Sequence, residues 1–280
     1  MAREEVLALH GGTAINLFVR NMPRLSVDID LTYLPSDGGN REAALQGIFD
    51  VLERIKINLE VQGLNVVHQA DKCKLQVSSK KAQIKVEVNS TGRGTLSEPQ
   101  KMILCDRAQT ELDAFVAMNV VPFGQLYGGK ICAALDRQHP RDMFDVKYLL
   151  ENEGFSEEVK RGFLLCLVGT SRPIHELIQP NRLDQREKMA NQFDGMTANI
   201  FSYEDFERVR EKLIRTIHEH LTSLDKDFIL SIGSGNPRWD IHNFANFPAV
   251  RWKLQNIQKL IANAPQKYQA QEEELRTKLS

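Results

Sequence analysis

The apolar positions at the start of the chain predict a strand, a glycine turn and a helix. The run VLALH ends at Gly11, Gly12 and Thr13, and the next segment, AINLFVR, has apolar residues at helical spacing. Residues 26–33, SVDIDLTY, then alternate strictly between polar and apolar, which predicts a second strand. Asp28 and Asp30 are therefore expected on one face of that strand.

A helix and three further strands follow in the pattern. Residues 42–59 carry apolar side chains at intervals of three and four, as in an amphipathic helix that packs on a sheet. The segments LNVVH, KLQVS and AQIKVEVN predict strands separated by turns. In the last segment Lys85 and Glu87 alternate with apolar residues, so Glu87 can share a polar sheet face with the two aspartates. We expect a loop at residues 90–101 and a strand with a turn at residues 111–124.

Helical patterns dominate from residue 126 onward. Residues 126–137 and 140–150 predict two helices, and the second has Pro140 at its first position, where a missing N–H costs least. Strand patterns become sparse after Glu153, so we place a domain boundary at Gly154. The pattern predicts an α+β fold in which residues 1–154 form one domain and residues 155–280 form a mainly helical second domain.

Composition and charge narrow the class of protein. The 36 Lys and Arg residues against 37 Asp and Glu give a net charge of −1, so a polyanion would have to bind a local basic patch. With 42% hydrophobic and 26% charged residues, the chain has a globular composition. No apolar run approaches the roughly 20 residues of a membrane-spanning helix, and the start lacks a signal-peptide core. We therefore expect a cytoplasmic protein with no membrane partner, and reduced thiols at its four cysteines.

The acidic face calls for a cation. Asp28, Asp30 and Glu87 would repel one another on one sheet face, which destabilises the fold unless positive charge is supplied. Two Mg²⁺ ions about 3.5–4 Å apart, held by three carboxylates, would resolve this repulsion and stabilise an in-line phosphoryl displacement. Glycine backbone at Gly11 and Gly12, followed by a helix start, can approach a phosphate closely.

In their order and spacing, LHGGTAINLF, SVDIDL and IKVEVN resemble the signature of nucleotidyltransferases of the DNA polymerase β type. The stretch GGKICAALDRQHPRDMFDVKYLL is in turn similar to a motif of the AbiEii-like toxin nucleotidyltransferases, which include the MenT toxins of type IV toxin–antitoxin systems. Its matched positions are Lys130, Ala133, Arg137, Arg141, Asp142 and Asp145. The motifs together cover about residues 7 to 150.

This resemblance implies a fold and an activity. The fold would be a nucleotidyltransferase-type mixed sheet flanked by helices, with the catalytic domain in residues 1–154 and a helical domain in residues 155–280. Members transfer a nucleoside monophosphate from an NTP, in some cases to the 3′ end of tRNA, and so block translation. The implied partners are an NTP, an RNA acceptor with tRNA favoured, and a cognate antitoxin in a toxin–antitoxin or phage-defence module.

The resemblance also implies roles for individual residues. Asp28 and Asp30 would bind Mg²⁺, with Mn²⁺ as an alternative, and Glu87 would complete the metal site or act as general base. Lys130 would neutralise the triphosphate, and Asp145 would support catalysis. The triphosphate would contact Gly11, Gly12 and Thr13. Members generally have a helical segment before the glycine strand, whereas ten residues precede Gly11 here, which suggests a late start codon or a trimmed variant.

Several alternatives stay open at this point. Residues 124–130, GQLYGGK, fit the spacing of a phosphate-binding loop, although Ile131 stands where a Ser or Thr should hold Mg²⁺. Asp142 could simply cap a helix or pair with Arg141. The acceptor could be a small molecule or a protein hydroxyl, or the chain could be a catalytically silent binding module. A basic patch for RNA would draw on Lys80, Lys81, Arg93, Arg137, His139, Arg141 and Lys147, unless these are ordinary solvated charges.

Overall fold

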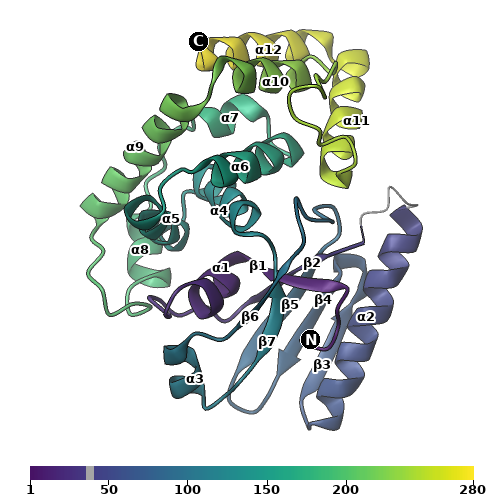
Figure 1. The fold of residues 1–280 in the computed structure, drawn as a ribbon, viewed down its shortest axis with the longest axis vertical. Coiled ribbons are helices and arrows are strands. Elements are labelled where there is room, and N and C mark those ends of the chain that lie inside the picture. Colours follow the sequence, from purple (N-terminus) through teal and green to yellow (C-terminus); the bar gives the residue numbers. More distant parts are fainter. Residues whose placement is uncertain (36–40) are drawn as a thin grey trace. The chain divides into compact units, whose positions relative to one another are not determined.

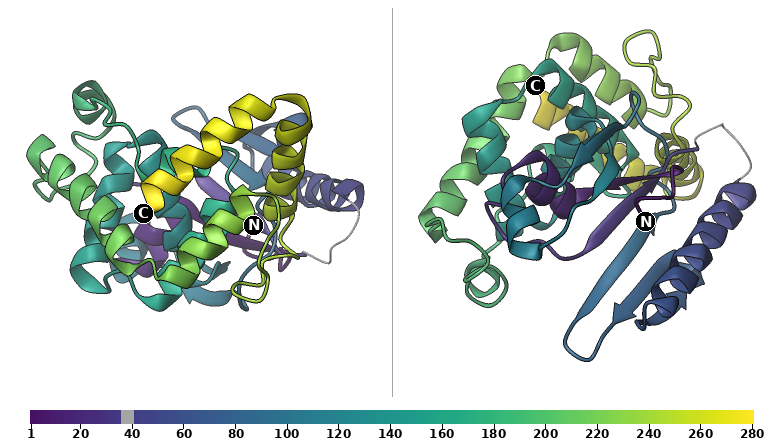
Figure 2. Two further views of the ribbon diagram at one scale, coloured as in Figure 1. Left: turned by 90° about the horizontal axis from the view of Figure 1, so that it is seen from above. Right: turned by 60° about the horizontal axis from the view of Figure 1, so that its bottom comes forward.

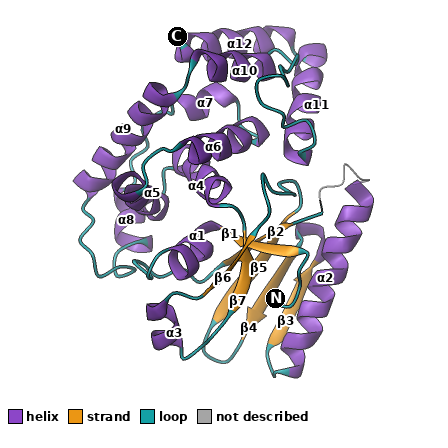
Figure 3. Ribbon diagram, viewed as in Figure 1, coloured by secondary structure: helices purple, strands orange, loops and turns teal. Residues whose placement is uncertain are grey.

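The chain divides into two compact units, Met1–Pro122 and Phe123–Ser280. The structure is a computed structural model that describes residues 1–35 and 41–280. All strands of these described residues belong to the first unit, and the second unit is built from helices (Figure 3). The domain boundary at Gly154 lies two helices further along the chain than this division and stays a prediction.

The first unit is built on a mixed sheet of seven strands (Figure 1). The strands are β1 Leu7–His10, β2 Ile29–Tyr33, β3 Asn65–Gln69, β4 Lys74–Ser78, β5 Gln83–Asn89, β6 Gln100–Ile103 and β7 Ala117–Val120. Their order in the sheet is β3-β4-β5-β2-β1-β7-β6. β2 is parallel to β5 and β1 is parallel to β7, while the other neighbours are antiparallel. The predicted α+β class with a mixed sheet is confirmed.

A long helix, α2 Arg41–Val61, runs along the strands β3 and β4 (Figure 2). Its buried residues follow helical spacing and are Ile48, Val51, Leu52 and Ile55. On β2, Leu31 is buried, and Tyr33 on the same side reaches α2 at Gly47. Because side chains alternate along a strand, Asp30 belongs to the opposite face of the sheet.

Some elements differ from the sequence-based expectation. β6 overlaps the end of the segment predicted as a loop. The strand was not predicted because its sequence, QKMI, shows no alternation, and it pairs only with β7 at the sheet edge. The helix α3, Asp106–Leu112, was not predicted. β2 begins at Ile29 instead of Ser26, so Asp28 lies just before the strand, and of the two aspartates expected on its face only Asp30 belongs to it. After the glycine turn, α1 Gly11–Ala14 continues as the π-helix η1 Ile15–Val19, and a 3₁₀ turn η2 covers Ala70–Lys72.

The helices of the second unit are α4 Phe123–Arg137, α5 Pro140–Asn152, α6 Glu157–Gly169, α7 Ile174–Ile178, α8 Arg186–Gln192, α9 Tyr203–His220, α10 Ser223–Gly233, α11 Pro248–Asn263 and α12 Pro265–Leu279. The first two confirm the predicted helices at residues 126–137 and 140–150. The backbones of α4 and α6 lie in close contact. A Cβ at Gly124 or Gly128 would overlap the backbone of α6, and a Cβ at Gly162 would overlap the backbone of α4. Glycine is thus required there for helix packing.

Candidate active site

The turn after β1 brings the carboxylate of Asp30 against glycine backbone. His10, the last residue of β1, is the register partner of Asp30 on antiparallel β2. Gly11 then has a φ of +74°, and a Cβ there would lie 2.7 Å from Asp30 Oδ2. This left-handed conformation favours glycine. Gly11 therefore makes the turn and also leaves the room that the Asp30 carboxylate occupies.

Side chains tie the turn to the segment that leads into β2. The buried hydroxyl of Thr13 donates to the backbone carbonyl of Asp28 and lies 3.1 Å from the hydroxyl of Ser26. A Cβ at Gly12 would lie 2.8 Å from the guanidinium of Arg24, which is itself buried. The turn and the acidic segment therefore form one connected block, and the Thr13 hydroxyl is engaged inside it.

Glu87 joins this block through strand pairing. β2 and β5 are parallel, with Asp30 opposite Glu87, so their side chains leave the same face of the sheet. Lys85, two residues earlier on β5, places its Nζ 3.3 Å from Glu87 Oε2. Partial burial disfavours the charged ammonium, yet Glu87, Asp28 and Asp30 outweigh this and raise the pKa of Lys85. All three carboxylates therefore act on one ammonium group.

The carboxylates of the acidic face do not converge on one metal position. Within residues 1–35 and 41–280, no three His, Cys, Asp or Glu side chains lie close enough together to hold a metal ion as they stand. Carboxylate oxygens are nevertheless the ligands that Mg²⁺ and Mn²⁺ prefer, and a Cβ at Gly11 would fill the space beside Asp30. The donor set fits a divalent ion, and the metal-binding role of Asp28, Asp30 and Glu87 stays a prediction.

In the second unit, Lys130 lies in a buried ion cluster between α4 and α5. Its Nζ is 2.8 Å from Asp142 Oδ1 and 3.0 Å from Asp145 Oδ2. The exposed fractions are 6% for Lys130, 1% for Asp142 and 2% for Asp145. The two aspartates are three residues apart on α5 and so share a helix face. The resemblance motif thus corresponds to a physical cluster, in which two carboxylates already neutralise the lysine.

Asp142 also forms an ion pair with Arg137, at the end of α4. Nε and Nη2 of Arg137 lie 2.6 Å and 3.0 Å from the two carboxylate oxygens of Asp142, a bidentate arrangement. Burial would raise the pKa of Asp142, but Lys130 and Arg137 together hold it well below its usual value. The N-cap of α5 is His139, whose Nδ1 accepts from the backbone N–H of Arg141. Neither helix capping nor a pair with Arg141 therefore explains Asp142.

The phosphate-binding-loop alternative at residues 124–130 is wrong. These residues lie inside α4, and Gly124 and Gly128 contact α6. A phosphate-binding loop needs glycine backbone exposed between a strand and a helix. The glycines of GQLYGGK instead allow two helices to approach.

Two members of the expected basic patch are buried. Arg93 donates from Nη1 to the carbonyl of Ser90 at 2.8 Å, and His139 Nε2 lies 3.0 Å from Gln192 Oε1. Burial lowers the pKa of both Arg93 and His139. These residues support the fold and do not present charge to RNA, which is a correction to the expected patch. Lys80 and Lys81 are exposed in the loop between β4 and β5.

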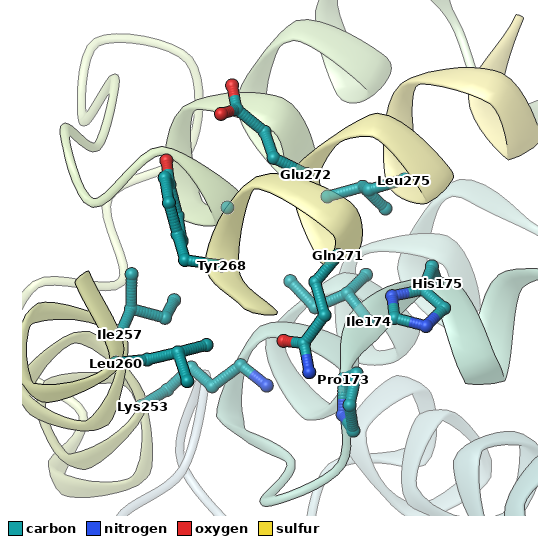
Figure 4. A pocket seen from close by; sticks show the side chains of 11 residues that line it. Pro173, Ile174, His175, Lys253, Ile257, Leu260, Tyr268, Gln271, Glu272 and Leu275 are labelled. Carbon is teal, nitrogen blue, oxygen red and sulfur yellow. The ribbon is translucent and has the colours of Figure 1, made fainter. Parts of the chain in front are cut away.

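A pocket in the second unit lies between α7, α11 and α12 (Figure 4). Its apolar walls include Ile174, Ile257 and Leu275, and Lys253 reaches into it. Lys253 is 8% exposed and donates from Nζ to the carbonyl of Arg172 at 2.5 Å. Burial lowers the pKa of Lys253 to about 8. None of the predicted site residues lines this pocket.

Residues 2–256 match the family model described as nucleotidyl transferase AbiEii toxin, type IV TA system. The chain belongs to the AbiEii family. It is therefore a nucleotidyltransferase, and its family is that of the toxins of type IV toxin–antitoxin systems. The resemblance inferred from the motifs is confirmed over a longer part of the chain than the motifs themselves cover.

The fold of this AbiEii chain is similar to that of MenT4, a nucleotidyltransferase toxin from Mycobacterium tuberculosis H37Rv. The TM-score is 0.60 at 17% sequence identity, over 90% of this chain and 85% of MenT4. At this identity the likeness concerns the fold alone. No curated protein sequence matches the chain significantly. Among the helices described for this AbiEii chain, none combines the length and apolar character that a membrane span requires.

Sequence reasoning overlooked Lys85 as part of the AbiEii carboxylate face. The residue was noted only as a polar position that alternates with apolar ones in QIKVEVN. The signal was present, because a residue two positions before Glu87 on a strand must leave the same face.

Proposed function

We propose that this AbiEii chain transfers a nucleoside monophosphate from an NTP to the 3′ hydroxyl of tRNA, in a reaction that depends on Mg²⁺ or Mn²⁺. We place the activity in the cytoplasm, in a module that blocks translation and limits phage growth. The observation that carries the proposal is that Asp30 and Glu87 are register partners on one sheet face beside the glycine turn, while Thr13 in that turn binds the backbone carbonyl of Asp28. Family membership supplies the reaction class.

The transfer joins the acceptor oxygen to the α-phosphorus of the NTP and releases pyrophosphate. Asp28, Asp30 and Glu87 would hold the divalent ion, which when bound offsets the triphosphate charge and lowers the pKa of the attacking hydroxyl. As the alternative to binding the ion, the Glu87 carboxylate, 44% exposed, would accept the proton from that hydroxyl. The Thr13 bond fixes the segment before β2 that carries Asp28, and the Gly11 turn lies against Asp30 on β2.

The glycine turn would bind the triphosphate through its backbone. The first N–H groups of a helix have no partner within the helix, and Gly11 and Gly12 carry no side chain to block their approach to phosphate. Because the Thr13 hydroxyl already donates to Asp28, the contact expected from Thr13 falls to its backbone N–H.

Lys130 and Asp145 enter the proposal through the family motif. Lys130 would neutralise the triphosphate, and Asp145 would support catalysis by holding the ammonium in place. Their 3.0 Å ion pair supports the role of Asp145, since a buried lysine needs such a partner to stay charged, and a triphosphate would have to compete with Asp142 and Asp145 for the ammonium.

The proposal is tested by incubating the protein with each α-³²P-labelled NTP, Mg²⁺ and total tRNA. We expect label on tRNA, and no label when EDTA is present or when Asp30→Asn replaces the wild type. Asp71→Asn, at an exposed position in η2 of the same unit, is the matched control and should retain activity.

Other outcomes point elsewhere. Label on protein or on a small molecule would move the acceptor to that class. Absence of label with all four nucleotides would indicate a silent binding module. Label on tRNA that persists in Asp30→Asn would refute the metal-ligand role of Asp30.

A further inference from the structure

Lys85 is a cation held on the acidic face of the sheet. It precedes Glu87 by two residues on β5, and its Nζ lies 3.3 Å from Glu87 Oε2. Glu87 is in turn the register partner of Asp30 on β2. One ammonium therefore sits among the groups that the proposed function assigns to a divalent ion.

The pair is open to exchange with ions from solution. The side chain of Lys85 is 33% exposed and that of Glu87 is 44% exposed, so neither is locked in the core. Three carboxylates on one face repel one another unless positive charge is near. In the part of the chain that the structure describes, the acidic groups do not converge as a preformed three-ligand metal site. Lys85 supplies the positive charge that the face needs before an ion arrives.

We propose that Lys85 is a built-in counter-cation that makes the acidic face select the metal–nucleotide complex over the free divalent ion. A free ion of charge +2 competes with Lys85 for Glu87 and is repelled by the ammonium. A complex of the ion with a triphosphate carries net negative charge, so the same ammonium attracts it. Lys85 is thus a positioning residue that acts through Glu87, and the inference rests on the proposed function.

The test compares two affinities in the full-length protein. Mn²⁺ binding is measured by electron paramagnetic resonance, first with Mn²⁺ alone and then with Mn²⁺ and each of the four α,β-methylene nucleoside triphosphates. In Lys85→Met we expect Mn²⁺ alone to bind about three- to tenfold more tightly, because one repelling unit charge is removed from a solvent-accessible site. We expect the Mn²⁺–nucleotide complex to bind about three- to tenfold more weakly, for the opposite reason.

Two variants separate charge from structure. Lys85→Arg keeps the charge and should restore both affinities to within about twofold. Lys81→Met removes one lysine charge from the exposed loop next to β5 and should change both affinities by less than about twofold. Circular dichroism of each variant shows whether the fold is retained.

Each result has a definite meaning. Opposite changes of the two affinities in Lys85→Met support the inference. If the wild type binds Mn²⁺ with nucleotide and Lys85→Met alters neither affinity, or shifts both in the same direction, the inference is wrong and the proposed metal site stands. If the wild type binds Mn²⁺ neither alone nor with any nucleotide, the proposed function itself fails.

Discussion

Lys253 provides a quantitative test of how the second unit is packed. Its ammonium is buried in the pocket of α7, α11 and α12 and donates to the neutral carbonyl of Arg172. Burial lowers the pKa of Lys253 from 10.5 to about 8, although Glu176 opposes this in part. Each pKa unit corresponds to about 1.4 kcal/mol. Holding the charged form in the folded protein therefore costs about 3 kcal/mol at neutral pH.

The sign of the pH dependence follows from proton binding. Between pH 8 and 10.5 the unfolded chain holds the Lys253 proton and the folded chain has released it, so stability rises with pH in this window. Replacement by Met removes the buried charge and one hydrogen bond, which is worth about 1 kcal/mol. We expect Lys253→Met to be more stable than the wild type by about 2 kcal/mol at pH 7. This advantage should shrink by about 2 kcal/mol at pH 9.5.

Urea denaturation followed by circular dichroism at pH 7 and pH 9.5 measures both quantities. Lys259→Met is the matched control, because Lys259 is exposed on the same helix. It should change the free energy of unfolding by less than about 0.5 kcal/mol at either pH. A Lys253→Met variant that is less stable than the wild type at pH 7, or whose advantage is equal at both pH values, would refute the reasoning.

Three further predictions concern the packing and the site. Gly128→Ala forces a Cβ into the backbone of α6 and should destabilise the protein by about 3 kcal/mol in the same urea experiment. Gly129→Ala is the control, because its Cβ would lie 3.8 Å from Cys166 Sγ. It should be neutral or stabilise the protein by up to about 1 kcal/mol. Lys130→Met leaves two buried carboxylates without their lysine and should lower the free energy of unfolding by about 3–5 kcal/mol, measured by urea denaturation. A loss of less than about 1 kcal/mol would contradict the role of Lys130 in the buried cluster. Gly11→Ala introduces a Cβ 2.7 Å from Asp30 Oδ2 at a φ of +74°. It should therefore lower the free energy of unfolding by about 1–2 kcal/mol and abolish label transfer to tRNA. Full activity in a folded Gly11→Ala protein would show that this contact is not needed for the transfer.

Local patterns predicted much of the carboxylate face. Alternation correctly placed Asp30 on the polar side of one strand and Glu87 on the polar side of another, whereas Asp28 lies just before β2. Local patterns could not predict the pairing of Asp30 with Glu87. α2, β3 and β4 lie between β2 and β5 in the sequence, and packing across the sheet sets the register of the two strands.

The second unit shows the opposite limit. Helical spacing predicted α4 and α5, and the motif named Lys130, Asp142 and Asp145, yet nothing in one sequence states that these residues are buried together. The glycines of α4 were open to interpretation as a loop because glycine is common in both settings. Only the neighbouring backbone of α6 shows that glycine is needed there for helix contact.

The parallel pairing of β2 with β5 also bears on when the protein can become active during its synthesis. The glycine turn and both aspartates leave the ribosome early, but Glu87 arrives only after α2, β3 and β4 have been made. Pairings between distant segments form late in folding. A nascent chain that ends before residue 87 therefore lacks the acidic partner of Asp30, so the carboxylate face can assemble only after about the first third of the 280 residues has been made.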